Sequence, residues 1–157
     1  MENDENLVEK AKAIATIAHA GHYRNDMVTD YIVHPAAVAE RLKNQSDEII
    51  ATAWLHDTIE DTSVTVQSLV EGGIPQIVID AVSVLTLNKG ISYKEYLERV
   101  KKHPIAKVVK IADMLSNLAD SPSEKQIKKY CRGLLYLLDD RQENPEKGLQ
   151  KPDTVVS

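Results

Sequence analysis

Residues 104–120 read PIAKVVKIADMLSNLAD, and this stretch decides the fold class. Its apolar side chains recur at the three- and four-residue spacing of a helix that buries one face. The same period recurs through most of the chain, whereas the strict alternation that is typical of strands is nearly absent. The sequence therefore predicts an all-α fold with a long helix in this stretch.

Toward the N-terminus, turn signals divide the chain into three predicted helices. The first is expected from about residue 6 to residue 20, and Gly21 ends it. A polar, turn-rich loop follows over residues 21–33, and Pro35 is expected to start the second helix. Ser46 can cap a third helix that runs through residue 61.

The remaining helices are marked by capping residues and by glycine or proline at their ends. They are expected over residues 65–71, from 75 to about 88, over 92–102 and 104–120, and from residue 121 onward. Two capping boxes, Ser92 with Glu95 and Ser121 with Glu124, mark two of these starts. Pro122, at the first position of the last helix, supports the second of them.

Length and composition place the chain among ordinary globular proteins. Its 157 residues correspond to one domain, and its 43% apolar and 27% charged residues exclude a disordered or fibrous chain. We expect a single bundle of seven or eight helices over residues 1–140. A loosely ordered polar tail is expected over residues 141–157.

Three features bear on where the protein resides. No apolar run approaches the roughly 20 residues of a membrane span. The acidic N-terminal stretch MENDENLVEK is unlike a secretory signal or a transit peptide. The single cysteine, Cys131, cannot form an internal disulfide and excludes a cysteine-rich zinc site. We therefore expect a cytoplasmic protein that is not bound to membranes.

Charge is distributed unevenly along the chain. The net charge of −5 argues against a nucleic-acid-binding protein held by bulk electrostatics. Basic residues without acidic neighbours nevertheless gather within residues 99–111 and 125–138. Two interpretations stay open: these are solvated helix faces, or they form a basic wall for a small phosphorylated ligand.

The segment HDTIED, residues 56–61, is the most informative one for chemistry. On a continuous helix, His56 lies over Glu60 and Asp57 lies over Asp61, so four groups able to bind a metal or move protons share one side. The residues between and before them are largely apolar, so this side borders the core. Carboxylates placed against apolar neighbours are costly unless a cation compensates them. The segment therefore indicates a metal site, although a His-Asp pair alone is also common as a surface hydrogen bond.

Further candidate ligands come from two other predicted helices. His34 stands directly before Pro35, at a helix N-terminus, and Asp113 lies in the middle of an otherwise apolar helix. Each has a structural alternative, a helix-capping histidine and a salt bridge to another helix. Lys110 and Asn117 lie about one turn on either side of Asp113, so the three share a face.

Together these residues make a mixed nitrogen and oxygen site drawn from three helices. The four candidate ligands are His34, His56, Asp57 and Asp113. Helical bundles build metal sites in this way. The donor set suits Mn²⁺, Fe²⁺, Zn²⁺ or Mg²⁺, and the ligand types do not choose among them.

Four segments of the chain resemble a known family. They are AHAGHYRND at residues 18–26, YIVHPAAVA at 31–39, AWLHDTIEDT at 53–62 and VKIADMLSNL at 109–118. This pattern resembles the HD-domain phosphohydrolases, and among them the hydrolase domain of RelA/SpoT proteins and the small alarmone hydrolases, including metazoan SpoT homologues. The resemblance covers about residues 8–120.

The resemblance implies a Mn²⁺-dependent hydrolase that removes the 3′-pyrophosphate from (p)ppGpp and gives GDP or GTP plus pyrophosphate. In the family pattern, His34, His56, Asp57 and Asp113 match the metal ligands, and Glu60 and Asp61 match an acidic pair beside the attacking water. Asn117 matches an asparagine that contacts the nucleotide. Arg24 falls in a loop that carries an arginine near the base.

The residue types add expectations about nucleotide binding and about the proton transfer. Arg24 and Lys110 can neutralise phosphate charge, and Tyr130 can stack on a base. Glu60, one turn beyond His56, is the candidate general base, and Asp61 would orient the water or Glu60. The expected partner is thus a small nucleotide, while the oligomeric state stays open.

Two other functions stay open. One is an HD-type phosphohydrolase that acts on a 5′-phosphate, a modified nucleotide or a cyclic nucleotide. Asn25 and Met114 favour it, because the family usually has basic residues at these two positions. The other is a non-catalytic module that keeps the metal site for binding. The pair Glu60 and Asp61 argues against it, because a binding module needs no water-activating acid.

Overall fold

The computed structural model describes residues 6–141, and these residues form nine helices. In chain order the helices are α1 (Leu7–Ala18), α2 (Val33–Arg41), α3 (Asp47–Leu55), α4 (Thr58–Asp61), α5 (Val66–Glu71), α6 (Gln76–Leu85), α7 (Tyr93–Lys102), α8 (Pro104–Leu118) and α9 (Glu124–Leu138). The predicted all-α class is confirmed. The predicted tail over residues 141–157 lies, apart from Arg141, outside the described residues.

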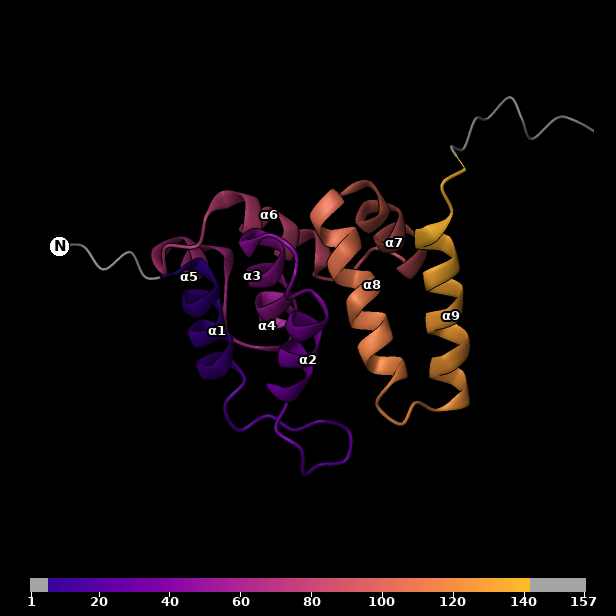
Figure 1. Ribbon diagram of the computed structural model, residues 1–157, viewed down its shortest axis with the longest axis horizontal. Helices are drawn as coiled ribbons and strands as arrows, with labels where there is room; N and C mark the ends of the chain where they lie inside the picture. The colour runs from indigo at the N-terminus through magenta and orange to yellow at the C-terminus, as the bar shows by residue number, and fades with distance from the viewer. Residues whose placement is uncertain (1–5, 142–157) are drawn as a thin grey trace, which may run out of the picture.

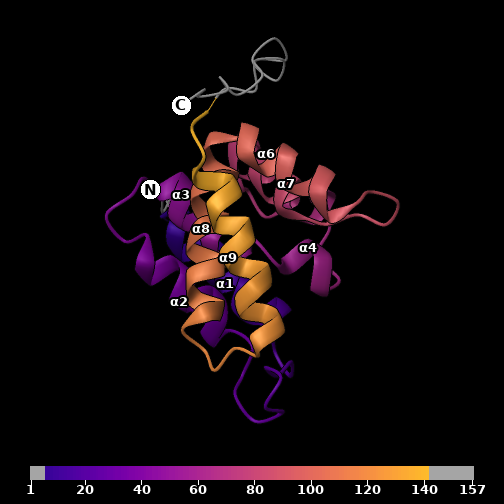
Figure 2. The same ribbon diagram turned by 90° about the vertical axis from the view of Figure 1, so that its right-hand side faces the viewer.

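The helices pack in two groups that meet at α3 and α8. Figure 1 shows α1 to α6 on one side and α7 to α9 on the other. Helix α8 packs against α2, α3, α6, α7 and α9, so it links the two groups. Figure 2 shows α9 lying alongside α8. No helix within residues 6–141 is long and apolar enough to cross a membrane.

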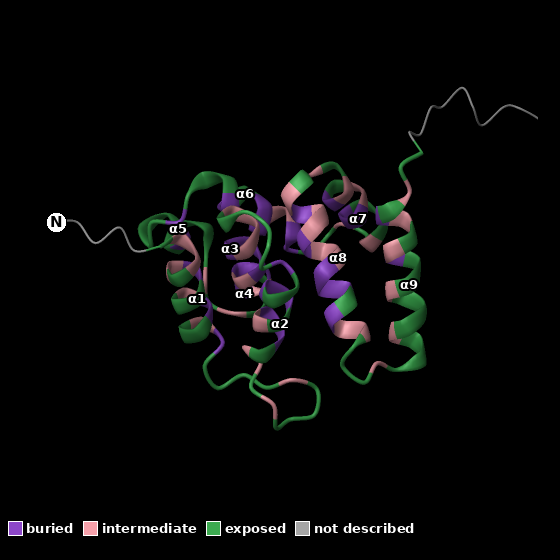
Figure 3. Cartoon of the chain, viewed as in Figure 1, coloured by how far each residue is buried: buried purple, intermediate pink, exposed green. Residues whose placement is uncertain are grey.

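Two clusters of buried apolar side chains form the core, and α3 contributes to both. Ala53 belongs to the cluster between α3 and α8, whereas Ala51 and Leu55 belong to the cluster between α1 and α6. Helix α3 is therefore buried on more than one side, and α8 buries most of its length as well (Figure 3). In contrast, α9 exposes one whole face. The two central helices are the rigid elements that position the site.

The predicted third helix is interrupted, which gives the ninth helix. Helix α3 ends at Leu55, and the single turn α4 begins at Thr58. Side chains replace backbone donors at this junction, because Thr58 Oγ1 donates to the Leu55 carbonyl at 2.8 Å and His56 Nδ1 donates to the Ala53 carbonyl at 2.7 Å. The expectation of one continuous helix through residue 61 was therefore wrong, although Asp61 still follows Asp57 by one turn, since its amide donates to the Asp57 carbonyl at 3.0 Å.

The start of α9 also differs from the prediction. Ser123, rather than Ser121, accepts a hydrogen bond from the Gln126 amide, and Gln126 Oε1 accepts one from the Ser123 amide. Pro122 thus precedes the cap instead of following it. Ser121 has a φ of 46°, a left-handed conformation that an N-cap does not adopt. The capping motif that sequence reasoning placed at Ser121 lies two residues further on.

A pair of serine substitutions tests this cap. Ser123→Ala should lower the free energy of unfolding by about 1 kcal/mol, because it removes the acceptor for an amide in the first turn. The matched control Ser121→Ala should change it by less than about 0.5 kcal/mol. Urea unfolding monitored by circular dichroism measures both values. A larger loss in Ser121→Ala than in Ser123→Ala would place the cap at Ser121.

Candidate active site

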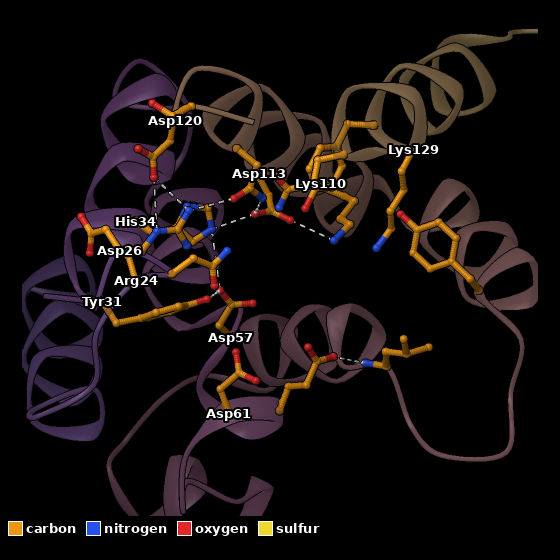
Figure 4. A pocket seen from close by; sticks show the side chains of 18 of the residues that line it. Arg24, Asp26, Tyr31, His34, Asp57, Asp61, Lys110, Asp113, Asp120 and Lys129 are labelled. Carbon is orange, nitrogen blue, oxygen red and sulfur yellow. Dashed lines mark hydrogen bonds and ion pairs between the residues drawn. The ribbon is translucent and has the colours of Figure 1, made fainter. Parts of the chain in front are cut away.

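Four side chains from three parts of the chain converge at the junction of α2, α3 and α8. His34 lies in the first turn of α2, His56 and Asp57 lie between α3 and α4, and Asp113 lies in the middle of α8. His34 Nε2 is 2.8 Å from Asp113 Oδ1 and 3.7 Å from Asp57 Oδ2. His56 Nε2 is 3.0 Å from Asp57 Oδ2 and 3.5 Å from Asp113 Oδ1. Figure 4 shows His34, Asp57 and Asp113 turned toward one another.

These separations fit a shared divalent cation. Two ligand atoms that each lie about 2.1 Å from one ion are about 3.0–3.5 Å apart in tetrahedral or octahedral geometry. His56 donates from Nδ1 to the Ala53 carbonyl, so Nε2 is free to coordinate. Nε2 is buried and has no hydrogen-bond partner among the described residues, although Asp57 Oδ2 is close. The ring is therefore aimed at a point between the carboxylates.

The electrostatics of the cluster favour ionised carboxylates. Burial raises the pKa of Asp113, but the Lys110 ammonium, 2.9 Å from Oδ2, and the His34 hydrogen bond hold it well below its usual range. Burial likewise raises the pKa of Asp57, and the neighbouring His56 outweighs it and brings the value to about 2. Two carboxylates that stay ionised inside the protein require positive charge beside them. Lys110 and His56 supply part of it, and a divalent cation between the carboxylates would add to it.

Asn117 and Arg24 extend this network toward the solvent. Asn117 donates from Nδ2 to Asp113 Oδ1 at 3.1 Å and accepts from Arg24 Nη2 at 3.1 Å. Arg24 also forms an ion pair with Asp120 at 3.2 Å. Lys110, Asp113 and Asn117 thus share one face of α8, as their spacing predicts. The loop between α1 and α2 brings Arg24 to this face.

Tyr31 is a member of the site that sequence reasoning missed. Its hydroxyl donates to Asp57 Oδ2 at 2.6 Å. The centre of its ring lies 4.8 Å from the centre of the His19 ring and 5.4 Å from the guanidinium carbon of Arg24. Tyr31 therefore fixes the orientation of a candidate ligand. The available signal was its position three residues before His34, which places both side chains at the same end of α2.

Glu60 and Asp61 project from α4 beside Asp57. One carboxylate oxygen from each of these three residues lies within 4.8 Å of the other two. Glu60 Oε1 accepts a hydrogen bond from the Leu87 amide at 2.6 Å, which fixes this side chain in place. Burial, with added repulsion from Asp57 and Glu60, raises the pKa of Asp61 to about 6. The pair therefore offers one anchored carboxylate and one whose affinity for a proton is raised.

A pocket of about 580 Å³ opens over the cluster. Nine of the ten sequence-predicted site residues line it, and His56 lies behind its wall. The nine residues are Arg24, His34, Asp57, Glu60, Asp61, Lys110, Asp113, Asn117 and Tyr130. Tyr93 and Tyr96 also line the pocket and were not predicted. Lys129 lines it too, and it belongs to the basic stretch 125–138 for which a wall against a phosphorylated ligand was one of the two open interpretations.

The family usually has basic residues at the positions of Asn25 and Met114, and only one of these two positions lies at the site. Asn25 does line the pocket. Met114 is fully buried between α8 and α9, where a Cβ atom at Gly133 would come within 2.6 Å of its Cε. Met114 therefore packs in the core and does not line the pocket, so its lack of charge gives no support to the alternative substrates.

Replacing one candidate ligand tests whether the cluster holds a cation. Asp113→Asn keeps the size of the side chain but removes its charge, so we expect at least a tenfold loss of Mn²⁺ affinity. Asp120→Asn, on the pocket rim, is the matched control and should retain the affinity. Calorimetric titration of chelator-treated protein and metal content after dialysis measure the effect. Unchanged metal content in Asp113→Asn would remove this residue from the ligand set.

Comparisons with known proteins give relatives of two lengths. No family model matches the chain. It is 32% identical over 147 residues to guanosine-3′,5′-bis(diphosphate) 3′-pyrophosphohydrolase MESH1 of Xenopus tropicalis, which covers 83% of this chain and 82% of the relative. It is 31% identical over 136 residues to a probable GTP pyrophosphokinase of Mycobacterium leprae. That match covers 78% of this chain but only 17% of the much longer relative.

The fold is also shared with a solved structure. A protein described as a metazoan ortholog of SpoT that hydrolyses ppGpp superposes with a TM-score of 0.72 at 23% identity, over 91% of each chain. This structure confirms the fold, and the Xenopus relative confirms the resemblance identified from the four sequence segments. Because the match to the Xenopus relative spans most of both chains, this chain belongs to the family of guanosine-3′,5′-bis(diphosphate) 3′-pyrophosphohydrolases that MESH1 represents.

Proposed function

We propose that this protein removes the 3′-pyrophosphate from ppGpp and its 5′-triphosphate analogue, giving GDP or GTP and pyrophosphate. The observation that carries the proposal is the convergence of two imidazoles and two carboxylates beside the acidic pair Glu60 and Asp61. A relative that is similar over most of its length is named for this reaction. The reaction would take place in the cytoplasm, as the single cysteine Cys131 predicts.

We propose Mn²⁺ as the resident cation, with other divalent cations as substitutes. His34, His56, Asp57 and Asp113 would hold it, and this mixed nitrogen and oxygen set suits such an ion. When bound, the cation supplies Lewis acidity at the phosphoryl group that is attacked. Tyr31 and Asn117 act on the ligands, because each donates a hydrogen bond to one of the two carboxylates.

The acidic pair performs the proton transfer. A water oxygen attacks the phosphorus attached to ribose O3′, the bond from phosphorus to O3′ breaks, and pyrophosphate leaves. Glu60 is held by the Leu87 amide through one oxygen, so its other oxygen can accept the proton of the water. Asp61 beside it orients the water or receives the proton from Glu60. The proton then passes to the ribose oxygen that is released.

The other predicted residues bind the nucleotide. Lys110 lies at the pocket wall beside Asp113, where its ammonium reduces the negative charge that an incoming phosphate meets. Tyr130 faces the same pocket and offers a ring for stacking on the base. Arg24, already bridged to Asn117, contributes a planar cation at the opposite wall.

A nucleotide panel with Mn²⁺ tests the function. Incubation with ppGpp should produce GDP and pyrophosphate in equal amounts by chromatography, and EDTA should stop the reaction. Survival of ppGpp while a 5′-nucleotide in the same panel is consumed would replace this function by 5′-phosphohydrolysis. Binding of nucleotides without any product would indicate the non-catalytic module.

Substitution of the acidic pair tests the assignment of the base. Glu60→Gln keeps the hydrogen bond from Leu87 but cannot accept a proton, so turnover should fall by about 10²–10⁴-fold while metal content stays unchanged. Glu71→Gln, on α5, is the matched control and should leave turnover unchanged. If Glu60→Gln turns over at the native rate and Asp61→Asn does not, the base is Asp61.

A further inference from the structure

The pocket over the candidate metal site is acidic, although the proposed substrate is a polyanion. Its lining carries six carboxylates and three cationic side chains. Two of the three cations are engaged, since Lys110 pairs with Asp113 and Arg24 pairs with Asp120. A divalent cation would balance the charge at the buried end only. The phosphates at the other end of the substrate need positive charge from another source.

Lys129 of α9 is the third cation, and it differs from the other two. It forms no ion pair within the described part of the chain, and its Nζ lies 4.7 Å from the centre of the Tyr93 ring and 5.7 Å from that of Tyr130. In Figure 4, Asp113, Lys110 and Lys129 follow one another along the pocket, away from His34. The free ammonium group therefore stands toward the end of the pocket remote from the metal ligands.

A second cavity, between α7 and α9, has the opposite charge balance. It measures about 930 Å³, its surface is mainly apolar and includes Leu97 and Gly133, and five cationic side chains surround this apolar surface. The cations are Lys94, Lys125, Lys128, Lys129 and Arg132. Glu124 is the single carboxylate of its lining, and Lys128 already pairs with it at 2.9 Å. Tyr93 and Lys129 line both cavities, so they form the boundary between the acidic pocket and this basic groove.

The hydroxyl of Tyr93 adds an independent observation at the same boundary. It is buried and has no hydrogen-bond partner among the described residues. An unpaired buried hydroxyl destabilises the protein, and a hydrogen bond to a ligand oxygen would remove this cost. Burial raises the pKa of Tyr93, so the hydroxyl keeps its proton and remains a donor. A phosphate oxygen is an acceptor for such a donor.

We infer that Tyr93, Lys129 and the basic groove between α7 and α9 form the subsite for the 5′-phosphates of the nucleotide. The inference rests on the proposed function for one point, which is that the 3′-pyrophosphate lies at the metal ligands. The ribose then separates the two phosphate groups, and the 5′ end extends past Lys110 to Lys129. Lys125, Lys128 and Arg132 would extend the subsite for a longer 5′-phosphate chain. Affinity should therefore rise with the number of 5′-phosphates.

Nucleotide binding without hydrolysis gives the first test. In calorimetric titrations of the native protein, affinity should rise from GMP to GDP to GTP. Lys129→Met keeps the aliphatic stem over the tyrosines and should reduce GTP affinity by about threefold to fivefold, as expected for a partly exposed ion pair. Lys43→Met, which removes one positive charge after α2, is the matched control and should behave like the native protein. Equal affinities for the three nucleotides in the native protein would overturn the subsite.

Tyr93→Phe separates a binding role from a structural one. Because the hydroxyl has no partner within the protein, its removal should leave the melting temperature unchanged or raise it, and should still weaken GTP binding. A lower melting temperature with native GTP affinity would assign the hydroxyl a structural role and remove Tyr93 from the subsite.

Turnover shows which end of the substrate Lys129 contacts. Lys129→Met should raise KM for ppGpp with kcat within about twofold of native, and should not change KM for guanosine 3′-pyrophosphate, which lacks 5′-phosphates. An equal rise for both substrates would place Lys129 at the 3′ end and contradict the inference. If neither substrate is hydrolysed while GTP binding still depends on Lys129, the proposed function fails and the subsite is supported.

Discussion

Two ionised carboxylates at the inner end of the pocket, where it meets the helix core, are the constraint on which the rest of the structure depends. Asp113 and Asp57 face each other across two imidazoles, and each is held by further donors, Asn117 and Tyr31. Such a cluster is stable only with positive charge at its centre. Because its members come from α2, α8 and the junction of α3 with α4, the cluster also fixes how these elements meet. The metal site and the packing of the central helices are therefore one feature.

Helical periodicity was sufficient to predict the class and most elements, but not the two places where side chains compete with the backbone. At residues 56–58, Thr58 and His56 bond to carbonyls of α3 and interrupt the helix, and no periodic pattern reports this. Ser121 and Ser123 are both followed three residues later by a polar partner, so the cap depended on backbone conformation. Local hydrogen bonds decided both cases.

The candidate site was predictable as far as residue types and helical spacing carry information. Asp113 stood out as a carboxylate in an apolar helix, and HDTIED as four titratable groups within six residues. Tyr31 and Tyr93 carry no such mark, because tyrosine is common in loops and on helix surfaces. Lys129 was marked only as one member of a basic stretch, which did not show that it faces the site. Only the tertiary structure brings Lys129 of α9 to the pocket of α8. The basic residues within 125–138 do not all face the same cavity. Lys129 lines both the pocket and the groove, whereas Lys125, Lys128 and Arg132 line the groove alone.

The central claim concerns the place of the cation. Crystals grown with Mn²⁺ and measured at a wavelength where manganese scatters anomalously would locate the ion directly. One strong anomalous peak among His34, His56, Asp57 and Asp113 is the result that the account predicts. The chain offers a second group of carboxylates that could attract a cation, formed by Asp57, Glu60 and Asp61. A peak held by that group alone, with none between the two histidines, would contradict the account.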